Sequence, residues 1–318
     1  MSLQAQGYRP YTGAFLPPQA AAVRAIALAG LRRPWKGRFF KLFLGLAQIP
    51  AVVYAVILFA EAGLARTGGG LAAAAAAGGA RGEMGPALKA GDDSMRLLLD
   101  AGFLLHSFLK LQLWTAALLV ALLAGADTIA GDVRANAMPL YFSRPITRTH
   151  YLAGKLLPVL FYLSLVTLAP ALLLLVARVS FMAGVEPAAG APGGAAAVAD
   201  LLGPALPLCA GAALVAVALS VLVLACSAAG GRNWVARAAF VLLWFLPLSL
   251  AAATRELTGG LPIAGYASLA DTLAALLAAL FGEATPLHPA GAAAGLAAWC
   301  AAGVGFLYWR LRRAAELR

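Results

Sequence analysis

Long apolar runs alternate with short polar segments along the chain, and six of the runs are long enough to cross a lipid bilayer. A helix of about 20 apolar residues, rising about 1.5 Å per residue, spans about 30 Å of hydrocarbon. Because lipid offers the backbone no hydrogen-bond partner, we predict that all six runs are helices. The predicted spans are residues 42–62, 106–128, 156–177, 205–228, 234–253 and 290–309.

The apolar run at residues 269–281 is different, because about 13 residues are too few to cross the bilayer. Ser268 stands just before this run and Asp271 follows three residues later, which resembles a capping box at the start of a helix. We therefore predict a short interfacial or re-entrant helix here, within the external segment 254–289 that joins the last two spans.

A second helix is predicted ahead of the first span, within the basic N-terminal segment 1–41. Residues 17–33 suit an amphipathic helix on the membrane surface, although Leu28 interrupts the pattern. In this helix Val23, Ile26 and Ala27 would face lipid, and Arg32 would face water.

The composition supports the membrane assignment. Of the 318 residues, 62% are hydrophobic and 12% are charged, whereas a soluble domain carries about 25% charged residues. We therefore predict one all-α, polytopic transmembrane domain over residues 1–318. The net charge of +11 would suit nucleic acid, but the basic residues follow the loops of the membrane topology, so we predict no nucleic-acid partner.

The Lys and Arg residues are concentrated on one side of the predicted topology. If both termini are cytoplasmic, the cytoplasmic segments contain 17 of them and the external segments contain 6. This bias predicts cytoplasmic termini and a multi-pass protein of the inner or plasma membrane. The cytoplasmic segments are then 1–41, 127–155, 229–237 and 310–318, and the external ones are 63–105, 178–204 and 254–289.

Two ionisable residues, His106 and Lys110, lie near the start of the second span and share a helix face. If the span starts at His106, both lie near the outer interface and Lys110 can snorkel to water. If the helix is embedded from Leu97, Lys110 lies near the middle of the membrane and needs a partner. We favour the interfacial interpretation.

Sequence motifs for catalysis and for metal or nucleotide binding are missing. A P-loop, GxxxxGK[ST], is absent, because Thr149 and Leu156 replace its first Gly and its final Ser or Thr around the Gly154–Lys155 pair. HExxH and GxSxG are also absent, and each of the three cysteines lies inside an apolar run without a CxxC pattern. We predict that the chain is not an enzyme and holds no metal or cofactor itself.

The loop between the second and third spans, residues 127–155, is the longest internal cytoplasmic loop of this topology. Pro139 and Pro145 forbid one continuous helix through it, so the second span should extend to about Ala137. The short segment 139–143 then presents apolar and aromatic side chains between Arg134 and Arg144. Such a segment suits either a docking surface for a partner or an interfacial anchor with aromatic side chains at headgroup level.

The stretch GDVRANAMPLYFSRPITRTHYLAGK resembles the cytoplasmic loop of ABC-2 type transporter permeases. The matching positions are Asp132, Ser143, Arg144, Pro145, Ile146, Thr147, Arg148, Tyr151, Gly154 and Lys155. The chain departs from the family pattern at Asp132, where Glu is frequent, and at Asn136–Ala137–Met138, where Gly-Thr-Leu is frequent. The six spans, the basic N-terminal helix, the short external helix and the C-terminal RxRR tail extend the resemblance over the whole chain.

The resemblance implies a permease that exports a substrate, or moves it between leaflets, as a homodimer with two ATP-binding subunits. ATP and Mg would be bound by those subunits, and the loop would form a coupling helix in a groove of the ATPase. Phe142 would be the docking side chain and Arg144 part of its polar rim. The implied partner-binding residues are Asp132, Arg134, Met138, Leu140, Tyr141, Phe142, Ser143, Arg144, Pro145, Thr147 and Arg148.

Two other functions stay open from the sequence. A membrane anchor or scaffold that transports nothing would have the same spans and the same loop. A secondary transporter fits less well, because no predicted span has a carboxylate near its centre. The residues do not indicate the substrate.

Overall fold

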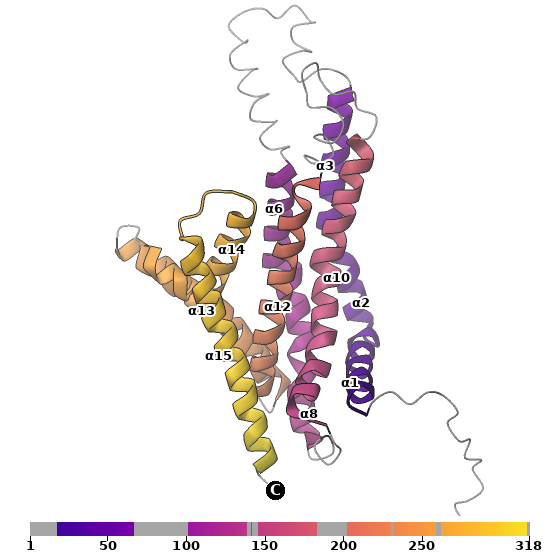
Figure 1. Ribbon diagram of the computed structural model, residues 1–318, viewed down its shortest axis with the longest axis vertical. Coiled ribbons are helices and arrows are strands. Elements are labelled where there is room, and N and C mark those ends of the chain that lie inside the picture. Colours follow the sequence, from indigo (N-terminus) through magenta and orange to yellow (C-terminus); the bar gives the residue numbers. More distant parts are fainter. Residues whose placement is uncertain are drawn as a thin grey trace, which may run out of the picture.

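The computed structural model describes residues 18–66, 101–138, 141, 146–182, 202–229, 232–258 and 262–316. Every regular element in these ranges is a helix, and six helical stretches are long and apolar enough to span a membrane (Figure 1). The predicted all-α, six-span architecture is therefore confirmed. The stretches are Arg38–Ala60, Phe103–Arg134, Arg148–Phe181, Ala205–Ala229, Asn233–Leu257 and Pro289–Arg313.

The bundle has two distinct ends. Helix α1 (Pro18–Trp35), helix α8 (Asp127–Arg134) and the C-terminal part of α15 (Pro289–Glu316) lie at one end, which we call the loop end (Figure 1). The short helix α14 (Leu269–Leu280) lies toward the other end, which we call the α14 end. Both termini of the helical bundle are thus on the same side, as six crossings require.

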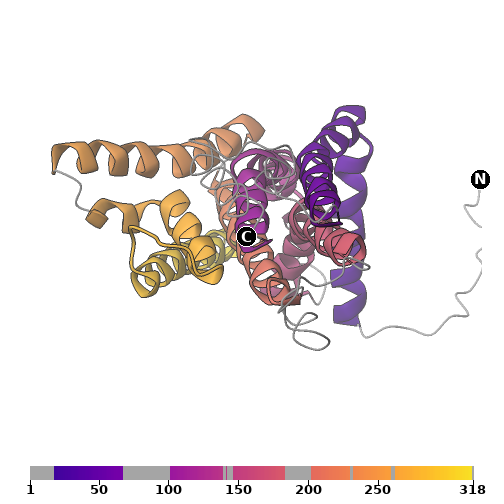
Figure 2. The ribbon, with the colours of Figure 1, turned by 90° about the horizontal axis from the view of Figure 1, so that it is seen from above.

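The spanning helices are arranged on two sides of one central helix, α12 (Ala205–Ala229). Helix α12 is apolar all round. In its most apolar segment of 18 residues, 72% of the residues are buried, as expected for a helix at the core. Helices α13 (Asn233–Leu257), α14 and α15 lie on one side of α12, and α1 to α3 lie on the other (Figures 1 and 2). In the corresponding 18-residue segments of α13 and α15, only 22% of the residues are buried. Both helices therefore leave wide apolar faces uncovered.

The first span is broken into α2 (Arg38–Leu46) and α3 (Ile49–Arg66). Pro50 follows the break directly, and its missing N–H removes one of the helical hydrogen bonds there. The fully buried Gln112 of the second span donates from Nε2 to the Ala47 carbonyl at 3.1 Å. A buried polar link thus ties the break in the first span to the second span.

The second span is helical throughout but contains two wide turns of π-helix. Its elements are α6 (Ala101–Gln112), η2 (Leu113–Ala117), α7 (Leu118–Val120), η3 (Ala121–Gly125) and α8. The helix continues to Arg134, close to the predicted end at about residue 137. The predicted length of this helix is therefore confirmed to within a few residues, whereas its position relative to a membrane stays a prediction.

Ser227 of α12 stabilises the second span just after its second π turn. The backbone N–H groups of Ile129 and Ala130 donate to Ser227 Oγ at 2.9 and 3.0 Å, and this hydroxyl donates to the Ala126 carbonyl at 2.6 Å. A side chain on Gly125 would lie 2.4 Å from Val223 Cγ1. Helix α12 therefore packs directly on the backbone where the second span changes its winding.

Helix α14 starts where the sequence predicts. Ser268 is its N-cap, and its hydroxyl accepts the Asp271 N–H at 3.2 Å, which is one of the two bonds of a capping box. The Ser268 N–H donates instead to the Gly265 carbonyl at 3.1 Å. A 3-10 turn, η4 (Pro262–Ala267), precedes it. Leu269, Leu273 and Leu277 are fully buried, so the helix is packed into the bundle and does not lie on its surface.

The N-terminal helix corrects one prediction. Helix α1 exists, but Ile26, predicted to face lipid, is buried against α10 (Arg148–Met182). A side chain on Gly154 of α10 would come within 2.9 Å of Ile26, and one on Gly30 within 2.6 Å of Pro158. These two glycines let the helices approach closely, so packing on α10 replaces packing on lipid.

Candidate functional site

The loop between the second and third spans begins with a tight helix end. Asn136 has φ of +49°, in the left-handed region, where Gly is preferred and Asn is the usual alternative. The Ala137 N–H donates to the Asp132 carbonyl at 2.9 Å, and the Asn136 N–H donates to the Val133 carbonyl at 3.1 Å. This pair of bonds is a Schellman motif, so the backbone stops the helix sharply and turns away.

The third span begins with a side-chain cap. Thr147 precedes α10, and its hydroxyl accepts the His150 N–H at 3.4 Å while Oγ1 lies 2.5 Å from His150 Nδ1. The Tyr151 N–H donates to the Thr147 carbonyl at 3.1 Å. Thr is a preferred N-cap residue for this reason. Both ends of the loop are therefore fixed by local hydrogen bonds.

A buried ion pair joins these two helix ends. Lys155 Nζ lies 2.6 Å from Asp132 Oδ2 and donates to the Thr128 carbonyl at 3.2 Å. The Tyr151 hydroxyl donates to the same Asp132 oxygen at 2.8 Å. Asp132, Tyr151 and Lys155 are all buried, and such a pair persists only when further hydrogen bonds satisfy it.

Tyr141 attaches the loop itself to this ion pair. Its ring lies 5.2 Å from that of Tyr151, and Lys155 Nζ lies 5.7 Å from its centroid, within the range of a cation–π contact. Burial and the nearby charge of Asp132 raise the pKa of Tyr141, and Arg33 opposes part of that effect. The phenol thus stays neutral at physiological pH. We call Asp132, Tyr141, Tyr151 and Lys155 the loop anchor.

Two arginines from other helices meet the second span beside the loop anchor. Arg33 of α1 donates to the Asp127 carbonyl at 3.4 Å, and its guanidinium lies where a side chain on Gly131 would be. Arg237 of α13 donates to Asp127 Oδ2 at 3.3 Å. Helices α1, α8, α10 and α13 are therefore connected by polar contacts at the loop end.

A cavity of about 370 Å³ lies between α1, the second span and α10, next to the loop anchor. Two cationic side chains, Arg33 and Lys155, and two acidic ones, Asp127 and Asp132, take part in its lining, so its formal charges balance. Within the described ranges, no group of three or more His, Cys, Asp or Glu side chains could hold a metal ion. The arrangement suits a structural brace between helices.

The predicted partner-binding residues divide into three groups. Arg134 and Thr147 are exposed and Arg148 is half-buried, so all three are accessible at the loop end. Asp132 and Met138 are buried and Tyr141 is half-buried against Tyr151; these three point into the bundle. Leu140, Phe142, Ser143, Arg144 and Pro145 lie outside the described residues.

The α14 end carries one salt bridge and one close contact between a histidine and a carboxylate. His106 is buried and its Nδ1 lies 2.6 Å from Glu283 Oε2, and Arg255 pairs with Asp271. Lys110 is exposed and has no ionic partner among the described residues. The two residues that sequence reasoning placed on one face therefore have different surroundings.

Several residues of the loop end were not anticipated from the sequence. Arg33, Asp127 and Arg237 come from three separate segments, and Ser227 appeared to be one more small residue in an apolar span. Their charges and the hydroxyl group can be read from the sequence, but the contacts among these side chains depend on how the helices pack. The signal that was available is that Asp127 and Ser227 are polar residues at the ends of long apolar runs.

Comparisons with known proteins leave the family open. No model of a protein family matches this chain, and no curated protein matches it either. The functional assignment therefore depends on the loop residues, on the six spans and on the contacts that hold the loop in place.

Proposed function

We propose that this chain is the membrane-spanning permease subunit of an ATP-driven transporter of the ABC-2 type, exporting or flipping an unidentified substrate. ATP would be hydrolysed by a separate ATP-binding subunit, because the sequence has no P-loop. The loop end would face the cytoplasm, in keeping with the excess of Lys and Arg there. The permease would act as a homodimer, as the family resemblance implies.

The observation that carries this proposal is the loop anchor. It fastens the loop to the last turn of the second span and the second turn of the third span through one buried ion pair. A partner that moves the loop would therefore move both spans together. A loop that served only as an interfacial anchor would not require a rigid link to two spans.

The lengths of the two flanking helices give further support. The second and third spanning stretches contain 32 and 34 residues, whereas about 20 suffice to cross the bilayer. In α10 the uncharged run begins after Lys155, so Arg148–Lys155 forms about two helical turns on the loop side of it. The described end of the loop at Arg148 thus lies beyond the uncharged run of α10, where a soluble subunit could reach it.

The docking step is tested by co-purifying the chain with its ATP-binding subunit, using the ATPase encoded beside it as the first candidate. Phe142→Ala should lower the affinity by about tenfold or more, because truncating an aromatic anchor commonly costs about 2 kcal/mol. Arg144→Ala should weaken binding less and in a salt-dependent way. Trp234→Ala is the matched control, since Trp234 is an exposed aromatic residue at the start of α13. Wild-type retention of the Phe142→Ala protein would contradict docking through this loop.

A second measurement separates a transporter from a scaffold. Tyr151→Phe removes one hydrogen bond of the loop anchor and leaves every exposed loop residue in place. In a transporter this change should reduce the stimulation of ATP hydrolysis by the permease while the ATP-binding subunit stays bound. In a scaffold, binding is the whole function, and hydrolysis by the complex would equal that of the isolated ATP-binding subunit with or without the change.

A further inference from the structure

Four cationic side chains and an exposed tryptophan gather where α1 turns into α2. The turn is made at Gly37, whose extended backbone precedes α2 and whose N–H donates to the Pro34 carbonyl at 3.0 Å. Lys41 Nζ of α2 lies 5.9 Å from the ring centroid of Trp35 at the end of α1, within the range of a cation–π contact. We call the exposed side chains at this turn the basic corner; they are Arg32, Trp35, Lys36, Arg38 and Lys41.

The four cations of the basic corner pair with no carboxylate among the described residues. The first 60 residues of the chain contain no Asp or Glu. Both acidic side chains of the cavity beside the corner are already paired with cations from α10 and α13. Arg33 is not counted in the corner, because it donates to the Asp127 carbonyl. The corner thus presents four positive charges that lack a counter-charge.

An exposed apolar stripe begins beside the basic corner and follows the first span. Its side chains are spaced three or four residues apart and are more than half exposed; they are Phe39, Leu42, Leu46, Ile49, Val53 and Val56. The opposite face of α2 is buried, and the ring of Phe40 packs edge-on against Tyr162 of α10 with 5.0 Å between the centroids. Helix α2 therefore has one face inside the protein and an apolar face outside it.

A membrane lipid matches both parts of this surface. The stripe belongs to Arg38–Ala60, a stretch long and apolar enough to cross a bilayer, and the chain carries no charge from residue 42 to residue 60. Acyl chains that lie along the stripe place the lipid phosphate where the uncharged run ends, and Lys41 directly precedes that run. A nucleic acid or an acidic soluble protein would meet the cations but would leave the stripe uncovered.

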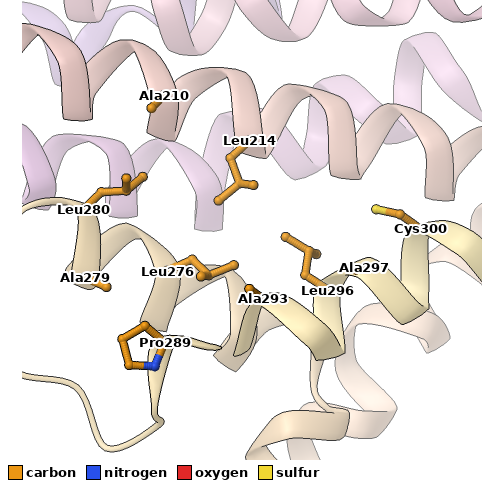
Figure 3. A pocket seen from close by; sticks show the side chains of 10 residues that line it. All are labelled: Ala210, Leu214, Leu276, Ala279, Leu280, Pro289, Ala293, Leu296, Ala297 and Cys300. Carbon is orange, nitrogen blue, oxygen red and sulfur yellow. The ribbon is translucent and has the colours of Figure 1, made fainter. Parts of the chain in front are cut away.

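Charge sets the basic corner apart from other apolar surfaces of the bundle. A groove between α12, α14 and α15 is lined by leucine and alanine side chains together with Pro289 and Cys300, and no charged side chain lines it (Figure 3). The exposed face of α13 around Phe245 is also apolar. Such surfaces do not distinguish one lipid headgroup from another, whereas a cluster of four cations favours a headgroup with net negative charge.

We propose that the basic corner binds the headgroup of an anionic phospholipid whose acyl chains lie along the exposed stripe of the first span. Each Lys or Arg close to an anionic membrane surface strengthens the attraction about fivefold. A zwitterionic headgroup such as phosphocholine gains less, because it brings a cation of its own. The inference needs only α1 and the first span, and it holds whether or not the chain proves to be a transporter subunit.

The test measures which lipid lies beside α2. Gly45→Cys carries a bimane fluorophore in a protein whose three native cysteines are replaced by alanine; a Cβ at Gly45 would meet no atom within 4 Å, and Lys41 is one helical turn away. Phosphatidylcholine liposomes contain a small fraction of spin-labelled phosphatidylglycerol or of spin-labelled phosphatidylcholine. The ratio of the two quenching constants cancels differences in depth between fluorophores. We expect this ratio to be about fivefold higher or more at Gly45 than at Phe245→Cys on α13.

Removing charge should localise the effect. The double variant Arg38→Gln/Lys41→Gln should lower the ratio at Gly45 by about fivefold or more. Arg134→Gln removes a charge from an exposed position of α8 and should leave the ratio unchanged. About 1 M salt, in which the Debye length is about 3 Å, should lower the ratio in the protein without charge substitutions. The salt measurement decides the matter if the double variant does not fold.

Four outcomes would overturn the proposal. Equal ratios at Gly45 and Phe245 would show that the corner has no preference for an anionic lipid. A ratio that neither the double variant nor salt lowers would place the lipid elsewhere. An equal fall in Arg134→Gln would assign the effect to the overall charge of the loop end. Loss of quenching by phosphatidylglycerol on addition of glycerol phosphate or a single-stranded oligonucleotide would assign the corner to a soluble anion.

Discussion

The two ends of the bundle hold their short elements in opposite ways. At the loop end, an ion pair with both partners buried joins α8 to α10, and hydrogen bonds from Tyr151 and to the Thr128 carbonyl complete it. At the α14 end, one partner of each contact is partly open to solvent, with side-chain exposures of 36% for Arg255 and 31% for Glu283. The Arg237–Asp127 pair at the loop end is similarly open, so the contrast concerns the Asp132–Lys155 pair alone. Helix α14 is held mainly by its buried leucines.

This difference indicates what each end is built to do. A buried, fully bonded ion pair tolerates few arrangements, because any displacement leaves a charge without a partner in an apolar surrounding. Apolar packing has no such directionality. The loop end therefore fixes the two helix ends on either side of the loop, whereas α14 is held by apolar packing.

The largest effect is expected for Asp132→Asn. This change leaves the buried Lys155 charged and unpaired, which should lower the free energy of unfolding by about 3–5 kcal/mol. Combining it with Lys155→Met should restore much of that loss, because no buried charge then remains. Unfolding in mixed micelles by a denaturing detergent measures both. Arg134→Gln, at an exposed residue of the same helix, is the control. An equal loss of unfolding free energy in this variant would show that the buried ion pair does not distinguish the loop end.

Ser227→Ala should have the next largest effect, about 2 kcal/mol or more, because the N–H groups of Ile129 and Ala130 lose their acceptor. The same two amides should exchange their hydrogens faster in the variant, which hydrogen–deuterium exchange detects. Ser249→Ala, at an exposed serine of α13 that bonds only within its own helix, should change neither. Unaltered exchange at both amides would mean that the second span does not depend on Ser227.

Substitutions at Asn136 test the sharp end of α8. Asn136→Val should destabilise the protein by about 1–2 kcal/mol, because a β-branched residue is strained in the left-handed region. Asn136→Gly should be neutral or slightly stabilising, since Gly adopts this conformation without steric conflict. The unfolding assay compares them. Equal stability of both variants would show that this residue does not keep a positive φ.

The smallest effect is expected at the α14 end. Arg255→Met removes one partner of a partly exposed pair with Asp271, and such pairs contribute about 0–1 kcal/mol. The loss of stability should therefore be well below that of Asp132→Asn under the same conditions. A loss as large as that of Asp132→Asn would show that ionic links fix both ends alike.

Much of the fold followed from the sequence because long uncharged runs leave few alternatives in a membrane. The six spans and α14 with its Ser268 cap are where the patterns placed them. The break in the first span and the two π turns were not predicted, because apolar periodicity does not report how tightly a helix is wound. Ile26 was assigned to lipid because a sequence shows that a face is apolar and not what covers it.

The candidate site was predicted as a set of residues but not as an arrangement. The family resemblance singled out Asp132, Tyr151 and Lys155, yet nothing in their spacing states that they bond to one another. Their meeting depends on the antiparallel packing of α8 and α10. Asn136 stands where the family pattern frequently has Gly. It occupies the one loop position with positive φ among the described residues. A requirement for this backbone conformation explains both Asn and Gly here.

The two π turns also bear on how the chain tolerates changes of length. In an α-helix, deleting one residue rotates everything beyond it by about 100° and carries buried side chains off their face. A π turn holds one residue more than an α-helical turn needs, so a deletion within Leu113–Ala117 or Ala121–Gly125 can leave regular helix with both flanks in phase. The second span thus contains two positions where its sequence can shorten while Asp132 still reaches Lys155.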